Sequence, residues 1–176
     1  DADRLSLCLS TQVGCAYRCQ FCASGLVPFK RQLSAAEIID QILLIRKDQK
    51  RSPTNLLFMG MGEPLANYEP TMEAIRILHD PRGVHLGARR ITVSTSGVVP
   101  QIRRLAEEGL PLGLAISLHA TTDALRDRLV PLNRRHNIGV GLKRFNGTLI
   151  PANSNFSFNA ILGKVDGSTG YKKELV

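Results

Sequence analysis

All four cysteines of this chain fall in one stretch near its N-terminus. Cys8 stands alone in "RLSLCLS", and Cys15, Cys19 and Cys22 follow with the spacing C-x3-C-x2-C in "GCAYRCQFC". Thiolates are soft ligands that favour zinc and iron–sulfur clusters over magnesium or calcium. The spacing therefore makes metal binding the first chemistry to consider.

Three interpretations of the cysteine triad compete. Disulfides would leave one of three thiols unpaired, and nothing in the sequence indicates an oxidising compartment. A zinc site needs a fourth ligand, but no histidine lies within ligand spacing of the loop, and His79 is far along the chain. An iron–sulfur cluster held by three thiolates would leave one iron open to a substrate, as open metal sites do. The sequence favours the cluster and leaves the other two open.

Polar residues follow three further apolar runs. "GMGEP", residues 60–64, comes after "TNLLFMG", Ser94 ends "RRITVSTS", and Ser117 to His119 end "LGLAISLH". Taken singly, these are a tight turn, a strand end and a loop histidine, the common fates of such residues. Chemistry in parallel α/β folds gathers at the carboxyl ends of strands, so the shared position favours one site.

The elements that must position these residues alternate between strand and helix. Apolar runs at 4–10, 54–60, 89–96 and 112–119 predict strands, and each is followed by a helical pattern. Four such units with strands apolar on both faces predict an α/β fold with a parallel sheet, either a full or partial barrel or a doubly wound sheet.

Helix boundaries are signalled by capping residues and prolines. Ser34 and Glu37 have the spacing of a capping box and predict a helix start there. Pro70 and Pro100 suit first helical turns, and Gly109 is placed to end the third helix. We expect a core over residues 1–138 and a divergent tail over 139–176, with a possible fifth strand in "NFSFNAIL" and a helix start in "STGYKKELV".

Cys8 lies inside the first predicted strand. Strand alternation puts Leu5, Leu7 and Leu9 on one face and Ser6, Cys8 and Ser10 on the other. A free cysteine in a strand is usually a small buried hydrophobe. The face shared with two serines instead predicts that Cys8 points into the interior of a barrel.

The charge and hydropathy of the chain narrow the classes of partner that it can bind. Lys and Arg exceed Asp and Glu by 23 to 15, a formal charge of +8 that favours a polyanion such as nucleic acid. No apolar run reaches the length of a membrane span, and the acidic start "DADRLSLCLS" is unlike a signal peptide. We expect a cytoplasmic protein without membrane contact, and the start without Met predicts further residues upstream.

The cysteine spacing, with Phe21 just before Cys22, resembles the signature of the radical S-adenosylmethionine (SAM) superfamily. The resemblance implies a 4Fe–4S cluster on Cys15, Cys19 and Cys22, whose open iron binds SAM and cleaves it to methionine and a 5′-deoxyadenosyl radical. "GMGEP" resembles the Gly-Gly-Glu-Pro element of that superfamily, in which Glu63 would accept from the SAM amino group.

Longer stretches between Arg4 and about Ile138 resemble the radical SAM RNA methyltransferases of the RlmN/Cfr type, notably "CLSTQVGCAYRCQFCASG" and "LAISLHATTDALRDRLVPLNRR". This resemblance implies a transferase that methylates adenine C2 of ribosomal RNA, and of transfer RNA in some members, with an electron donor as partner. It implies a partial (β/α) barrel and a SAM site lined by Phe21, Gly62, Glu63, Ser94, Ser117, Leu118 and His119.

The same family assigns Cys8 to proton removal from the substrate carbon and to resolving a covalent adduct, together with a second cysteine near the C-terminus. Met59 matches a family position near that second cysteine, although a core Met at a strand end fits nearly as well. No cysteine follows Cys22 here, so we expect an incomplete barrel with an exposed sheet edge and apolar face that does not methylate RNA alone. Alternatives are another radical SAM activity, or a basic RNA-binding fragment without catalysis.

Overall fold

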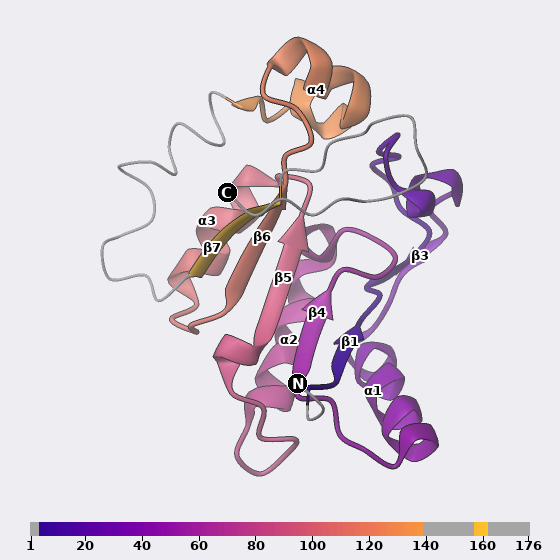
Figure 1. The fold of residues 1–176 in the computed structure, drawn as a ribbon, viewed down its shortest axis with the longest axis vertical. Helices are drawn as coiled ribbons and strands as arrows, with labels where there is room; N and C mark the ends of the chain where they lie inside the picture. Colours follow the sequence, from indigo (N-terminus) through magenta and orange to yellow (C-terminus); the bar gives the residue numbers. More distant parts are fainter. Residues whose placement is uncertain (1–3, 139–156, 162–176) are drawn as a thin grey trace.

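A five-stranded parallel sheet forms the centre of the molecule (Figure 1), in a computed structural model that describes residues 4–138 and 157–161. The strands stand side by side in the order β1-β4-β5-β6-β7. Their bounds are β1 Ser6–Cys8, β4 Asn55–Phe58, β5 Ile91–Thr95, β6 Gly113–Ser117 and β7 Ser157–Ile161. Strands adjacent in this sheet follow one another along the chain, as in a barrel built from βα units.

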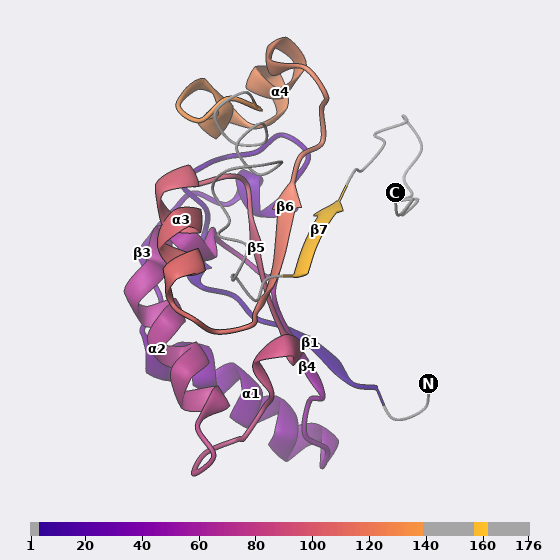
Figure 2. The same cartoon turned by 90° about the vertical axis from the view of Figure 1, so that its left-hand side faces the viewer.

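Helices connect the strands. They are α1 Ala35–Gln49, α2 Tyr68–His79, α3 Val99–Glu107 and α4 Asp123–Leu129. Figure 2 shows α1, α2 and α3 together on one side of the sheet, while α4 lies beyond the carboxyl ends of the strands. The four predicted βα units are confirmed, and β7 lies within the predicted fifth strand. The helix start predicted in "STGYKKELV" falls outside the described residues.

The predicted helix signals act as expected. The Ser34 hydroxyl accepts from the Glu37 amide at 3.2 Å while the Glu37 carboxylate accepts from the Ser34 amide at 2.9 Å, which completes the capping box. Gly109 follows α3 with a positive φ of 69°, a conformation that ends helices and favours glycine.

The core lies between the sheet and the three covering helices. From the strands it receives Leu56, Phe58, Ile91 and Val93, and from the helices a larger set of fully buried side chains that includes Ile38, Ile42, Met72, Ile75, Leu78 and Leu105. Burying one such side chain contributes roughly 1.5–3 kcal/mol, so this layer holds the strand ends in place.

The opposite face of the sheet carries smaller and more polar side chains. Leu7 and Leu9 pack toward the helices, while Ser6 and Cys8 are exposed, as the alternation in β1 predicts. Cys8 pairs in register with Leu57 of β4, which in turn pairs with Thr92 of β5. Within the described residues β1 is an edge strand, so the sheet is a partial barrel rather than a closed one.

Candidate functional site

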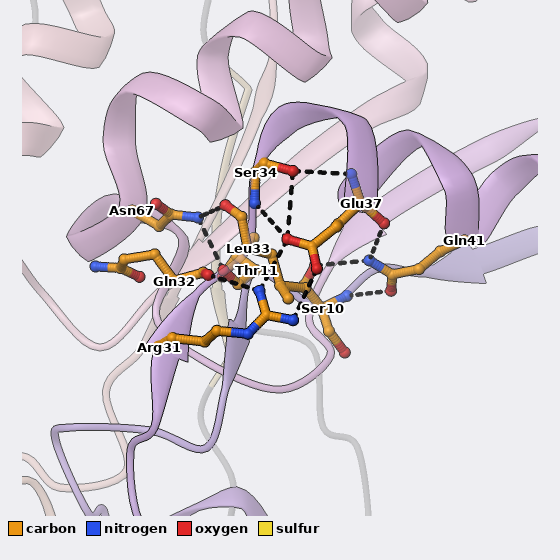
Figure 3. Close-up of polar contacts among 9 residues, drawn as sticks. All are labelled: Ser10, Thr11, Arg31, Gln32, Leu33, Ser34, Glu37, Gln41 and Asn67. Atoms are coloured by element: carbon orange, nitrogen blue, oxygen red, sulfur yellow. Dashed lines mark hydrogen bonds and ion pairs between the residues drawn. The ribbon is translucent and has the colours of Figure 1, made fainter.

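The three clustered cysteines lie on a loop, residues 14–30, that leaves and returns through a small antiparallel pair. This pair joins β2 Gln12–Val13 to β3 Arg31–Gln32. Asn67 connects the residue before β2 to the residue after β3, because its side-chain amide donates to the carbonyls of Thr11 at 2.8 Å and Leu33 at 2.7 Å (Figure 3). The two ends of the cysteine loop are therefore held at a fixed separation.

Helix α1 anchors the same loop from its other side. The Gln41 side chain makes two hydrogen bonds with the backbone of Ser10, at 2.9 and 3.0 Å. Arg31 donates to both carboxylate oxygens of Glu37, at 2.9 and 2.7 Å, so the residue that caps α1 also holds β3 (Figure 3). The capping box found in the sequence thus positions the cysteine loop as well as starting a helix.

A cavity of about 290 Å³ opens between the cysteine loop and the carboxyl ends of β4, β5 and β6. Nine predicted site residues line it: Cys15, Cys19, Phe21, Cys22, Gly62, Glu63, Ser94, Ser117 and His119. Cys8 and the Leu118 side chain do not line it. Met59 does, and at 37% exposure it is no core methionine.

Glu63 is the buried acid of this cavity, with 4% of its surface exposed. Its Oε2 accepts from the Ser96 amide at 2.7 Å and the Ser96 hydroxyl at 2.8 Å, and its Oε1 accepts from the Leu65 amide at 3.1 Å. Burial raises the pKa of the Glu63 carboxyl, and the hydrogen bonds from Ser96, Thr95 and Leu65 oppose that rise. A cationic ligand would offset the free-energy cost of burying this negative charge.

Gly62, just before Glu63, is required by close packing. It has a φ of 104°, and a Cβ at this position would lie 2.5 Å from the Cβ of Gln12. The side-chain Oε1 of Gln12 accepts from the Glu63 backbone amide at 2.9 Å. The tight-turn interpretation of "GMGEP" and its role beside a ligand are therefore compatible, because the turn is what presents Glu63.

The thiols of the triad are free and partly shielded from water. Burial raises the pKa of Cys19 to about 12, and the neighbouring Cys15 and Cys22 add to the rise; burial also raises the pKa of Cys15. Without a metal, Cys15 and Cys19 are neutral thiols, and binding a metal would release their protons.

The donor set fits a multi-iron cluster. Across residues 4–138 and 157–161, no three His, Cys, Asp or Glu side chains surround a point suited to one metal ion. A 4Fe–4S cluster makes a different demand, because each thiolate binds a different iron. Three free thiols on one cavity meet that demand and leave the cavity beside them for a second ligand.

Phe21 of the cysteine loop stacks on His119, which follows β6, with ring centroids 3.6 Å apart. His119 has a φ of 55°, and its buried Nδ1 has no hydrogen-bond partner among the residues that the structure describes. Burial lowers the pKa of His119, and the charge of Arg126 lowers it further, so the ring is neutral. This stack joins the two walls of the cavity.

Two groups of the site escaped sequence reasoning. Ser96 holds Glu63, and Arg126 of α4 is 3% exposed and donates to the carbonyls of Ser96, Ser117 and Leu118. Ser96 follows Ser94 at the same strand end, so its place was a usable signal. Arg126 had none, because a basic residue in a short helix is usually solvated.

Comparison with known proteins identifies the class that this fold and site define. The family model of the radical SAM superfamily matches residues 9–141, and the chain belongs to that superfamily. Its cofactors are accordingly a 4Fe–4S cluster and SAM, as the resemblance of the cysteine motif to this superfamily implies. A second family model, described as VanW like protein, matches residues 133–176.

The most informative relatives are RNA methyltransferases. The chain is 52% identical over 136 residues to the probable dual-specificity RNA methyltransferase RlmN of Thermotoga maritima, covering 77% of this chain and 40% of that one. It is 46% identical over 164 residues to the dual-specificity RNA methyltransferase RlmN of Syntrophobacter fumaroxidans, covering 92% and 48%. The chain thus spans less than half the length of these two relatives.

Solved structures agree on the fold. A radical SAM methyltransferase from Sphaerobacter thermophilus superposes with a TM-score of 0.82 at 45% identity, over 94% of this chain and 49% of that one. SuiB of Streptococcus suis bound to S-adenosylmethionine superposes with a TM-score of 0.59 at 17% identity, a likeness of fold alone. Among the helices described here, none has the length and apolar character needed to cross a membrane.

Proposed function

We propose that this chain is the cluster- and SAM-binding core of a methyltransferase that acts on adenine C2 of ribosomal RNA, and of transfer RNA in a dual-specificity enzyme. The observation that carries the proposal is the cavity on which three free thiols and the buried Glu63 meet. RNA is supported as the substrate by the 46–52% identity to dual-specificity RNA methyltransferases and by the net charge of +8.

In this proposal Cys15, Cys19 and Cys22 hold the cluster. When bound, the cluster and SAM supply a radical source and a methyl donor. The SAM site is formed by Phe21, Gly62, Glu63, Ser94, Ser117, Leu118 and His119. Glu63 accepts from the SAM amino group, which places a cation against the buried carboxylate. The stacked rings of Phe21 and His119 line the cavity and would shield a ligand bound there from water.

Cys8 is the proposed acid–base residue. It is exposed on the sheet face opposite the helices and lies outside the cavity that binds SAM, so a bulky RNA substrate has access to its thiol. Cys8 pairs in register with Leu57, two residues before Met59, whose exposed side chain lines the cavity. Cys8 would take the proton from the substrate carbon.

The remaining assignments follow from this role. The core comprises residues 1–138, and residues 139–176 form a divergent tail that includes the fifth strand, a division that the two family matches support. The enzyme works in the cytoplasm with RNA, and an electron donor reduces the cluster. The chain has no cysteine after Cys22 to carry a methyl group, so SAM cleavage is the activity we expect of it alone.

The test is anaerobic reconstitution with iron and sulfide, followed by separate assays for SAM cleavage and for methyladenosine in RNA. We expect bound iron, SAM cleavage on reduction, and methyladenosine only from a protein that supplies a further cysteine. A chain that takes up no iron would refute the proposal. RNA binding that weakens with salt but is unaffected by Cys15→Ala, without SAM cleavage, would support an RNA-binding fragment instead.

A further inference from the structure

Arg126 is a buried cation whose guanidinium contacts the backbone at the ends of two strands that line the cavity. Within residues 4–138 and 157–161, the groups that accept hydrogen bonds from this guanidinium are all neutral. We infer that Arg126 is a positioning residue for SAM, an inference that depends on the proposed function. It acts by fixing the carboxyl ends of β5 and β6 against each other, so that the two strand ends present their SAM-binding groups at one spacing.

The first contact fixes the end of β5. The Arg126 Nη2 donates to the Ser96 carbonyl at 2.6 Å, and the Ser96 amide and hydroxyl donate to Glu63 Oε2. A single residue, Ser96, therefore separates the guanidinium from the carboxylate of the cavity. Gly97, the next residue, has a φ of 114°, a conformation that favours glycine.

The second set of contacts fixes the end of β6. The guanidinium donates from Nη2 to the Ser117 carbonyl at 3.3 Å and from Nε to the Leu118 carbonyl at 3.1 Å. The next residue is His119, which stacks on Phe21 in the left-handed conformation. Arg126 thus holds the backbone immediately before the ring that closes the cavity.

Burying this charge is costly, which favours a specific role. A buried charge is tolerated when its hydrogen bonds are satisfied, and an apolar residue of similar volume is often as stable. The remaining nitrogen, Nη1, donates to Asn133 Oδ1 at 2.6 Å, and the Asn133 side-chain amide in turn donates to Asp127 Oδ1 at 2.6 Å. The planar guanidinium of an arginine can donate to several carbonyls at once in a fixed geometry, which the ammonium of a lysine cannot do.

The experiment compares Arg126→Lys and Arg126→Met with Arg128→Lys, a matched control at an exposed position of the same helix. Each is reconstituted anaerobically, and SAM affinity is measured by equilibrium dialysis together with the electron paramagnetic resonance spectrum of the reduced cluster during SAM titration. We expect bound iron to be unchanged and SAM to bind roughly 10- to 100-fold more weakly in both Arg126 variants, as for residues that orient a ligand from behind. The control should match the wild type.

A readout that separates positioning from folding is rescue by free guanidinium. In Arg126→Ala, millimolar guanidinium should restore SAM affinity and the SAM-induced spectral change, because the ion refills the space and bonds the same carbonyls. If Arg126 variants fail to fold, Asn133→Ala removes one of the four acceptors and should weaken SAM binding about 3- to 10-fold.

The outcomes are distinguishable. Unchanged SAM affinity in a folded Arg126→Lys or Arg126→Met protein, or in Asn133→Ala where those do not fold, overturns the inference and leaves the proposed function standing. Weak affinity in Arg126→Ala that guanidinium does not restore also counts against it. A wild-type chain that binds iron but no SAM refutes the proposed function itself.

Discussion

The two walls of the cavity are built in different ways. The cysteine loop has one short 3-10 helix, Ala23–Leu26, without a buried residue, and Leu26 is 87% exposed. The strand-end wall contains Glu63, which is 4% exposed, and is backed by Arg126, which is 3% exposed. Each of these two charged groups makes several hydrogen bonds.

This difference indicates which wall depends on its ligand for its final geometry. The strand-end wall is assembled by the core and its hydrogen bonds before any ligand binds, which is the preorganisation that binding sites need. The cysteine loop is anchored at its base by Asn67, Gln41 and the Arg31–Glu37 pair. Farther along the loop, the Gln20 amide donates to the Leu129 carbonyl at 2.9 Å and Phe21 stacks on His119. We expect the three thiols of this wall to take their final positions from the metal they bind. Mutations in the two walls should therefore fail in different ways.

The largest effect is expected in the loop wall. Cys19→Ala should reduce bound iron and the visible absorption of the reconstituted protein to background, because a thiolate ligand of the cluster is lost. The circular dichroism of the metal-free protein should not change. Cys8→Ala is the matched control and should retain full iron, since Cys8 lies outside the cavity. Equal iron in both variants would contradict the ligand assignment.

The next effect concerns the strand-end wall. Glu63→Gln should leave iron binding intact and weaken SAM binding by roughly 10- to 100-fold, the cost of losing a charge-assisted hydrogen bond. Equilibrium dialysis of SAM against reconstituted protein measures it. Glu107→Gln, at an exposed position of α3, is the control. Loss of iron together with SAM would show that the two walls are not independent.

A smaller effect is a pH dependence of the metal-free protein. Burial raises the pKa of Glu63 above the 4.5 of an exposed glutamate. At pH values between 4.5 and this raised pKa, the folded state therefore holds a proton that the unfolded state has lost. The stability of the wild type relative to Glu63→Gln should therefore fall as pH rises from about 4.5, then level off above the raised pKa. Urea unfolding from pH 4 to 8 measures this difference, and a flat or rising difference would contradict it.

The smallest effect tests the link between the walls. A double-mutant cycle with Phe21→Leu and His119→Asn should give a coupling energy of about 0.5–1.5 kcal/mol in the unfolding of the metal-free protein, as for stacked rings. Additive effects would mean that the walls are joined only by their ligands.

Much of this fold was predictable because its signals are local. Apolar runs, the Ser34–Glu37 capping box and Gly109 act within a few residues of themselves, and each behaves as predicted. The cysteine triad and "GMGEP" were predictable as parts of one site because parallel strands bring their carboxyl ends together.

Long-range partners were not predictable from one sequence. Arg126 lies 30 positions from Ser96, and Asn67 lies 56 from Thr11, yet each makes a hydrogen bond at 2.8 Å or less. A buried arginine and a surface arginine look alike in sequence, because burial depends on what other segments pack around the side chain.

By itself, the sequence determined the ligand chemistry, the order of strands and helices, and the strand face on which Cys8 lies. These follow from residue types, spacing and the two-residue period of a strand. Only the tertiary structure decided that Glu63 is buried, that Phe21 stacks on His119, and that Arg126 joins two strand ends. Burial and hydrogen bonding between distant residues arise when the sheet closes against its helices, and no local pattern records them.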